Sequence, residues 1–161
     1  MSKNSLSNAN IQQKIILLLY LEELYLSNTH GAQIENFPSM LKILDFSGVM
    51  IRDFEKIHLP ESLLEVDFSN DRIDYTNFYK LKLPSGLKKL DLSSTYMKSD
   101  ILPNLKLPKT LTHLILDNND ELFYVDLPNL DKGQNLHVSL FQNRTENIKV
   151  GNLQFHMEGM H

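Results

Sequence analysis

Acidic residues recur at one position of an alternating pattern of apolar and polar residues. Asp45, Asp67 and Asp91 each lie between two apolar residues, which are Leu44 and Phe46 in the first case. Alternation of this kind is typical of a short strand with one buried face, so the three carboxylates are expected on the other face. On parallel strands about 4.8 Å apart, neighbouring carboxylates repel each other by about 1 kcal/mol even in bulk water. Such a row could receive lysine or arginine side chains of a partner, or it could be solvated scaffold.

The outward positions on either side of these aspartates complete a candidate partner-binding surface. The pattern places His137 in the column of the aspartates, His113 in the column before it and Asp117 in the column after it. The predicted partner-binding residues are Glu23, Tyr25, Asp45, Glu65, Asp67, Lys89, Asp91, His113, Asp117 and His137. The excess of carboxylates predicts a protein partner with a basic contact surface.

Metal binding and catalysis receive little support from the same residues. Calcium requires about six to eight oxygen ligands around a curved loop, which a flat column of aspartates does not offer. His113 and His137 could bind zinc together with Asp117, but no dependable ligand stands at a characteristic spacing. The chain contains no motif of phosphate-binding loops, zinc proteases or serine hydrolases. We therefore predict no metal, no cofactor and no enzymatic activity.

Aromatic residues form a second candidate contact region on the flank of the repeats. Tyr75, Phe78 and Tyr79 lie close together in the sequence, and Tyr96 follows in the next unit. Phe78 is expected in the core. Tyr75 and Tyr96 are equally compatible with burial and with a role as exposed anchors.

The candidate residues belong to an internal repeat. The first leucine of each copy stands at positions 21, 41, 63, 87 and 111, so the steps are 20, 22, 24 and 24 residues. A period of this size predicts a solenoid. Each unit supplies one short strand. The segment that leads from that strand to the next unit, here called the return arm, is followed by a proline. Because proline fixes φ and stops a helix, the arms 52–59, 76–83 and 100–107 are expected to lack α-helix.

The copies at 59–68 (LPESLLEVDF), 83–92 (LPSGLKKLDL) and 107–116 (LPKTLTHLIL) resemble leucine-rich repeats. More narrowly, they resemble the Leu-Pro-x-x-Leu repeats of bacterial secreted effectors, and they are also similar to the Phe-Asn-Ile-Pro repeats of amoebae and large DNA viruses. The resemblance implies a protein–protein interaction module, either a secreted effector that acts in the host cytosol or an effector regulator. An alternative is a substrate-recognition subunit of a ubiquitin-ligase-type assembly. The ligase domain of some effectors needs a catalytic cysteine, and this chain has none.

These observations predict an α/β solenoid, a leucine-rich repeat arc of about six short parallel strands with little or no helix on the convex side. Residues 1–10 are expected to be a disordered leader. Residues 11–131 are expected to hold the repeats, with 11–20 forming either a capping helix or an irregular first repeat. Residues 132–161 should supply the last strand and a C-terminal β cap, for which a hairpin is one possible form.

Composition limits the classes of partner. The 161 residues carry a formal net charge of −4, which argues against nucleic acid because phosphate contacts require clustered lysine and arginine. The seven apolar residues Ile15–Leu21 are too short a run to span a bilayer. The absence of cysteine favours a reducing compartment. We therefore expect a cytoplasmic protein that is monomeric when alone and contacts no membrane.

Overall fold

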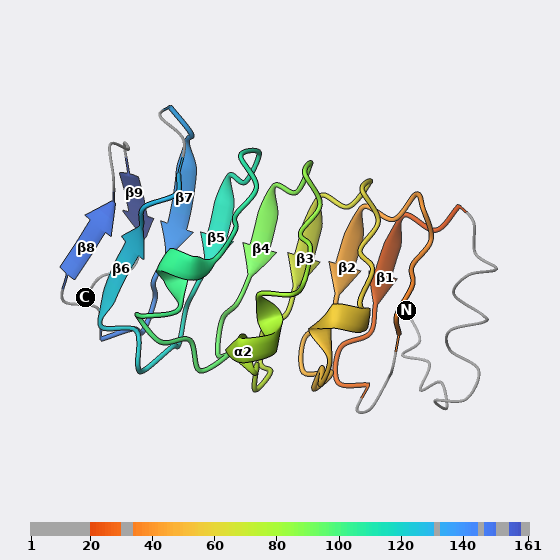
Figure 1. Cartoon of the computed structure of the whole chain (residues 1–161), viewed down its shortest axis with the longest axis horizontal. Coiled ribbons are helices and arrows are strands. Elements are labelled where there is room, and N and C mark those ends of the chain that lie inside the picture. The colour runs from red at the N-terminus through yellow and green to blue at the C-terminus, as the bar shows by residue number, and fades with distance from the viewer. Residues whose placement is uncertain (1–19, 30–33, 131–132, 145–146, 151–154, 159–161) are drawn as a thin grey trace.

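Short parallel strands stacked side by side form the body of the molecule (Figure 1). The computed structural model describes residues 20–29, 34–130, 133–144, 147–150 and 155–158. One sheet has seven strands in the order β1-β2-β3-β4-β5-β7-β9, and β6 pairs with β8 in a second sheet. The strands are β1 (Glu23–Tyr25), β2 (Ile43–Asp45), β3 (Glu65–Asp67), β4 (Lys89–Asp91), β5 (His113–Ile115), β6 (Tyr124–Leu127), β7 (Leu136–Ser139), β8 (Asn147–Val150) and β9 (Phe155–Glu158). The predicted solenoid is confirmed.

The register of the first five strands keeps each repeat position in one column. Leu44, Val66 and Leu90 are direct partners on β2, β3 and β4, and all three are buried. Asp45 and Asp67 are partners one residue later and lie on the opposite, half-buried face. Side chains alternate between the two faces of each strand, and the register is the same from one strand to the next. The apolar residues therefore all face the core, and the polar residues all face outward.

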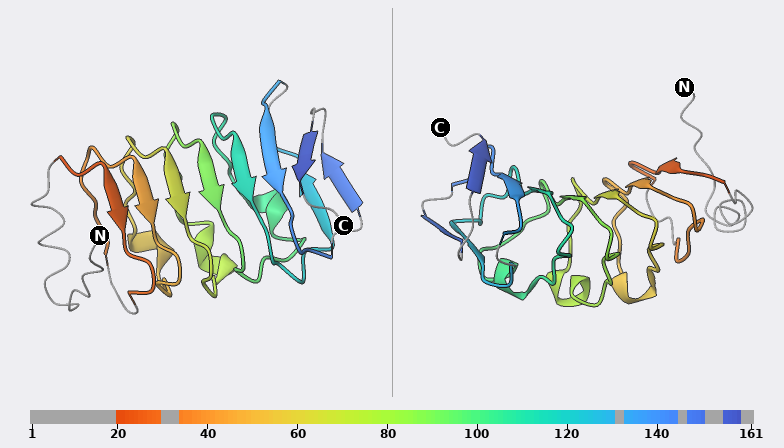
Figure 2. Two further views of the ribbon diagram at one scale, coloured as in Figure 1. Left: turned by 180° about the vertical axis from the view of Figure 1, so that it is seen from behind. Right: turned by 90° about the horizontal axis from the view of Figure 1, so that it is seen from above.

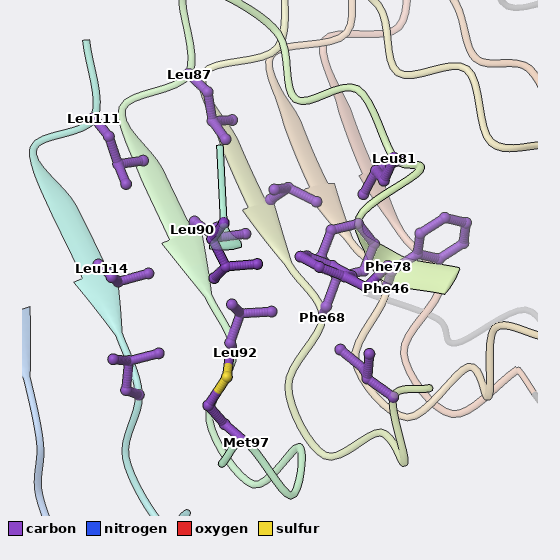
Figure 3. Close-up of a cluster of buried hydrophobic side chains, with 14 of the residues drawn as sticks. Phe46, Phe68, Phe78, Leu81, Leu87, Leu90, Leu92, Met97, Leu111 and Leu114 are labelled. Carbon is purple, nitrogen blue, oxygen red and sulfur yellow. The ribbon is translucent and has the colours of Figure 1, made fainter. Parts of the chain in front are cut away.

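The core lies between the large sheet and the return arms. Figure 3 shows Leu87, Leu90 and Leu92 projecting from one unit into this space, beside the aromatic side chains of earlier units. The rings of Phe54 and Phe78 meet edge-to-face with their centroids 5.1 Å apart. Leu90 is 0% exposed. Burying a leucine or phenylalanine side chain contributes about 1.5–3 kcal/mol, so each unit adds several such contributions to the shared core.

Only single turns of helix interrupt the return arms on the side opposite the large sheet (Figure 2, right). These turns are η2 (Phe54–Lys56), α2 (Tyr75–Phe78) and η3 (Leu102–Asn104). Asp53 and Asp74 cap the first two turns, because the carboxylate of each accepts a hydrogen bond from a backbone amide two residues later. The arms thus carry no more than one turn of helix within the described residues, which confirms a solenoid with little helix, although α2 gives the arm 76–83 a single α-helical turn where none was expected.

After each strand the chain turns through a left-handed residue at the same repeat position. The six such residues have φ between 55° and 65°: Asn28, Gly48, Asn70, Ser94, Asn118 and Gln142. Glycine and asparagine adopt this region at low cost, which explains why they fill four of these positions. The turn redirects the chain so that the following residue points inward.

The C-terminal strands extend the solenoid instead of folding back as a hairpin. Strand β9 pairs in parallel with β7, and β8 pairs in parallel with β6. A hairpin was therefore the wrong form for this cap. The predicted leader 1–10 lies outside the described residues, and so does the proposed capping helix at 11–20 except for the exposed Tyr20. Within the part of the chain that the structure describes, no helix is long and apolar enough to cross a membrane.

Candidate functional site

The outward surface of the large sheet, here called the open face, carries a shallow hollow over β1 to β4. Its volume is about 220 Å³, and six of the predicted partner-binding residues line it. They are Tyr25, Asp45, Glu65, Asp67, Lys89 and Asp91. The sequence had placed these residues in adjacent columns, and the register brings them together as expected.

The serine two positions after each of the three aspartates holds the aspartate side chain in place by hydrogen bonding. The Asp45 Oδ1 atom accepts hydrogen bonds from the Ser47 amide at 2.9 Å and the Ser47 hydroxyl at 2.7 Å. Asp91 accepts the same two bonds from Ser93, at 2.9 Å and 2.6 Å. The amide of Ser69 donates to Asp67 Oδ1 at 2.7 Å. The repeated Asp-x-Ser sequence therefore shapes the end of each strand and holds the row of carboxylates in place.

Burial and mutual repulsion act on the ionisation of this row. Partial burial raises the pKa of Asp91, and the nearby charge of Asp67 raises it further. Hydrogen bonds from Ser93 and the charge of Lys89 act in the opposite direction. A cation brought to the row would favour the ionised carboxylates, which is the electrostatic basis for attraction of a basic group.

The first strands extend the acidic character beyond the row. The Tyr25 hydroxyl donates to Glu23 Oε2 at 3.0 Å, and this hydrogen bond is the main reason that the pKa of Tyr25 is raised. The Lys89 ammonium lies 4.0 Å from a carboxylate oxygen of Glu65, with both side chains well exposed. An exposed pair at that distance contributes little. The five carboxylates of Glu23, Asp45, Glu65, Asp67 and Asp91 thus outnumber the single lysine of this region.

Asp117 lies in its expected column and bonds to the next unit, whereas His137 lies in a different column from the one expected. Asp117 Oδ1 accepts a hydrogen bond from the Ser139 hydroxyl at 2.7 Å and one from the Phe141 amide at 2.8 Å, so this carboxylate joins adjacent units. His137 is the register partner of His113, and Ser139 stands in the column of the aspartates. The predicted column for His137 is therefore wrong by two residues.

The error arose because Leu136, Val138 and Leu140 alternate through three apolar positions, which fits two registers equally well. A polar signal could have decided between them. Asn143 stands 24 residues after Asn119, and its side-chain oxygen accepts the Asn119 amide hydrogen at 2.6 Å. This spacing continues the 24-residue step of the preceding units.

The aromatic flank is only partly exposed. Tyr75 and Phe78 are buried, at 6% and 3% exposure, so Tyr75 is not an exposed anchor. Tyr96 is 63% exposed, and the guanidinium of Arg72 lies 5.7 Å from its ring centroid. Tyr96 also has φ of 60°, a costly conformation for a residue with a large side chain. Tyr96 therefore remains a possible contact residue outside the open face.

Comparisons of the chain with protein-family models, curated proteins and solved structures find no match. Function must therefore be argued from the solenoid, the open face and the chemistry of its columns.

Proposed function

We propose that the protein is a non-catalytic interaction module that binds a basic element of a protein partner through its open face and the adjoining turns. The observation that carries the proposal is the row of three in-register aspartates, each fixed by a serine of its own strand end. Fixed carboxylates lose little conformational entropy when a cationic side chain binds them.

The size of the open face indicates which other residues the partner contacts. Seven strands about 4.8 Å apart give a strip roughly 30 Å long, and three residues per strand make it about 10 Å wide. The resulting area of roughly 300 Å² is well below the roughly 800 Å² that each partner buries in a standard interface. A stable partner therefore also touches the turns that follow the strands, where Asn28, Asn70 and Asn118 are exposed.

The resemblance of the Leu-Pro units to the repeats of secreted effectors supports a specific setting for this activity. In that setting the protein is a leucine-rich repeat effector, or a regulator of one, and meets its partner in the host cytosol. The alternative role in a ubiquitin-ligase-type assembly requires a second docking surface away from the open face. Binding that survives removal of the acidic charge would point to such a surface.

The test compares two double variants after a partner has been obtained by affinity purification from the host cell. Asp67→Asn with Asp91→Asn removes two charges but retains side-chain oxygens that can accept the serine hydrogen bonds. Glu55→Gln with Asp100→Asn is the control, because it removes the same two charges from exposed side chains outside the open face. We expect the asparagine variant to bind about tenfold more weakly and with a smaller salt dependence, mainly through slower association.

Equal affinity and equal salt dependence in wild type and the asparagine variant, with the fold intact, would contradict the proposal. The open face would then be solvated scaffold, and the flank around Tyr96 would be the next surface to test.

A further inference from the structure

A hollow separate from the open face, here called the flank hollow, lies at the turns that follow β4 and β5. Its volume is about 260 Å³. Residues of two consecutive units line it, and these are Ser94, Tyr96, Asn118, Asp120 and Glu121. None of the five lies on a strand, so the flank hollow shares no residue with the row of aspartates on the open face.

The ring of Tyr96 forms one wall of the flank hollow. Arg72, Tyr96 and Asp120 occupy the same repeat position in consecutive units, 24 residues apart in each case. The Arg72 guanidinium lies 5.7 Å from the ring centroid, within the range of a cation–π contact. Because the unit of Arg72 precedes that of Tyr96 and the hollow lies towards the unit of Asp120, the ring has Arg72 on one side and the hollow on the other.

The polar groups of the flank hollow are mainly hydrogen-bond acceptors that carry negative charge. Asp120 is exposed, and within the described part of the chain its carboxylate has no ion-pair partner. Glu121 pairs with Lys98, whose ammonium lies 2.7 Å from Oε2. Lys98 balances one of the two carboxylates, so the hollow retains the charge of Asp120 beside an exposed aromatic ring.

We propose that the flank hollow binds an arginine side chain of the protein partner, with the guanidinium stacked on Tyr96 and donating hydrogen bonds to Asp120. A guanidinium is planar, stacks on aromatic rings and donates several N–H bonds in a fixed fork, whereas the lysine ammonium is a strongly hydrated point charge. A ring next to a carboxylate therefore favours arginine over lysine.

This inference rests on the proposed function, because the arginine belongs to the same basic element that binds the open face. The hollow lies at the turns that adjoin that face, where additional contact with the partner is needed. Tyrosine and arginine are also among the residue types that contribute most binding energy at protein interfaces. The flank hollow thus supplies an anchor for the partner outside the row of aspartates.

The experiment titrates the full chain, labelled with nitrogen-15, with N-acetyl-arginine amide and follows backbone amide signals by nuclear magnetic resonance. The corresponding citrulline derivative has nearly the same shape without the charge, and the lysine derivative has the charge without the planar group. We expect the arginine derivative to shift the signals of Tyr96, Asn118 and Asp120. The lysine derivative should bind there more weakly, and the citrulline derivative should leave these signals unchanged.

Two variants test the ring and the carboxylate separately. Tyr96→Leu removes the aromatic ring and Asp120→Asn removes the charge, and each should weaken binding at the flank hollow about two- to fivefold. Tyr79→Leu and Asp100→Asn are the matched controls, because they make the same changes at exposed side chains that do not line the hollow. If Tyr96→Leu fails to fold, Tyr96→Gly removes the ring and suits the left-handed φ of this position.

The proposal is overturned if the arginine derivative leaves the signals of the flank hollow unchanged or if the citrulline derivative shifts them equally. Unchanged affinity at the hollow in both the ring variant and the charge variant would also overturn it. In any of these cases, shifts at Asp45, Asp67 and Asp91 would show that the open face still binds the cation, so the proposed function would stand without this anchor. The open-face variant Asp67→Asn with Asp91→Asn should bind the arginine derivative at the flank hollow as wild type does, and a loss there would show that the hollow is not a separate site.

Discussion

Asn119 and Asp71 occupy the same repeat position two units apart, but only Asn119 donates hydrogen bonds from its side chain. The Asn119 amide nitrogen donates to the carbonyl oxygens of Leu92 at 3.0 Å and Leu116 at 2.8 Å. Asp71 is 2% exposed, and its Oδ2 accepts the Ile51 amide hydrogen at 3.1 Å. Its Oδ1 has no hydrogen-bond partner among the described residues. One buried carboxylate oxygen therefore remains uncompensated in the middle of the solenoid.

Asp71→Asn should therefore stabilise the protein. The new amide can donate to backbone carbonyls, as the amide of Asn119 does, and the substitution removes a buried unsatisfied oxygen that costs about 1–3 kcal/mol. The free energy of unfolding, measured by urea titration, should rise by about 1 kcal/mol. The reciprocal substitution Asn119→Asp removes two donated bonds and should destabilise the protein by a similar or larger amount.

We expect Asp71→Asn to raise the free energy of unfolding and Asn119→Asp to lower it. If Asp71→Asn destabilises the protein as Asn119→Asp does, Asp71 Oδ1 must already have a favourable partner, such as an internal water. The two positions would then not be equivalent in their hydrogen bonding.

Leu90→Ala tests whether the strand register defines a close-packed core. Leu90 is 0% exposed and stands between the buried partners Val66 and Leu114. Truncation should create a cavity and lower the free energy of unfolding by about 2–5 kcal/mol. Lys89→Ala changes the adjacent, half-buried outward position and should alter stability by less than about 0.5 kcal/mol. A loss below about 1 kcal/mol for Leu90→Ala would mean that this position is not tightly packed.

The strand columns could be predicted from sequence because two independent patterns agree for β1 to β5. Alternation identifies which side of each strand is buried, and the repeat spacing aligns one strand with the next. The same spacing predicts that Asp45, Asp67 and Asp91 lie side by side, and the strand register confirms it. At Leu136–Leu140 alternation is the only signal for the strand, it fits two registers, and the predicted register is wrong.

Side-chain partners were harder to predict than columns. Tyr75 has a polar group at its tip and stands on a one-turn helix, so the sequence allowed either a buried or an exposed ring. Burial depends on a hydroxyl partner 20 residues away, Thr95, which no local pattern identifies. The pairing of His113 with His137 likewise depends on the register between β5 and β7, which local alternation does not determine.

The Tyr75–Thr95 contact leads to a prediction at alkaline pH. The two hydroxyl oxygens are 2.6 Å apart, and Thr95 donates its own hydrogen to the Leu92 carbonyl, so the phenol is the donor to Thr95. Burial raises the pKa of Tyr75 far above its ordinary value of 10.0. Above pH 10 the unfolded chain therefore releases this proton while the native state retains it. The contribution of Tyr75 to stability is present below pH 10 and is lost as the pH rises further.

The variant Tyr75→Phe should separate the effect of Tyr75 ionisation on stability from the effect of its hydrogen bond. At neutral pH the variant loses one hydrogen bond and should be less stable by about 1 kcal/mol. Above pH 10 wild type should lose up to about 1.4 kcal/mol per pH unit through this residue, whereas the variant lacks that loss and its curve of stability against pH should be shallower. Urea titrations between pH 7 and pH 11, followed by far-ultraviolet circular dichroism, give both quantities from one set of curves. Parallel curves for the two proteins above pH 10 would show that the Tyr75 hydroxyl ionises as readily in the native state as in the unfolded chain, and the buried contact with Thr95 would be wrong.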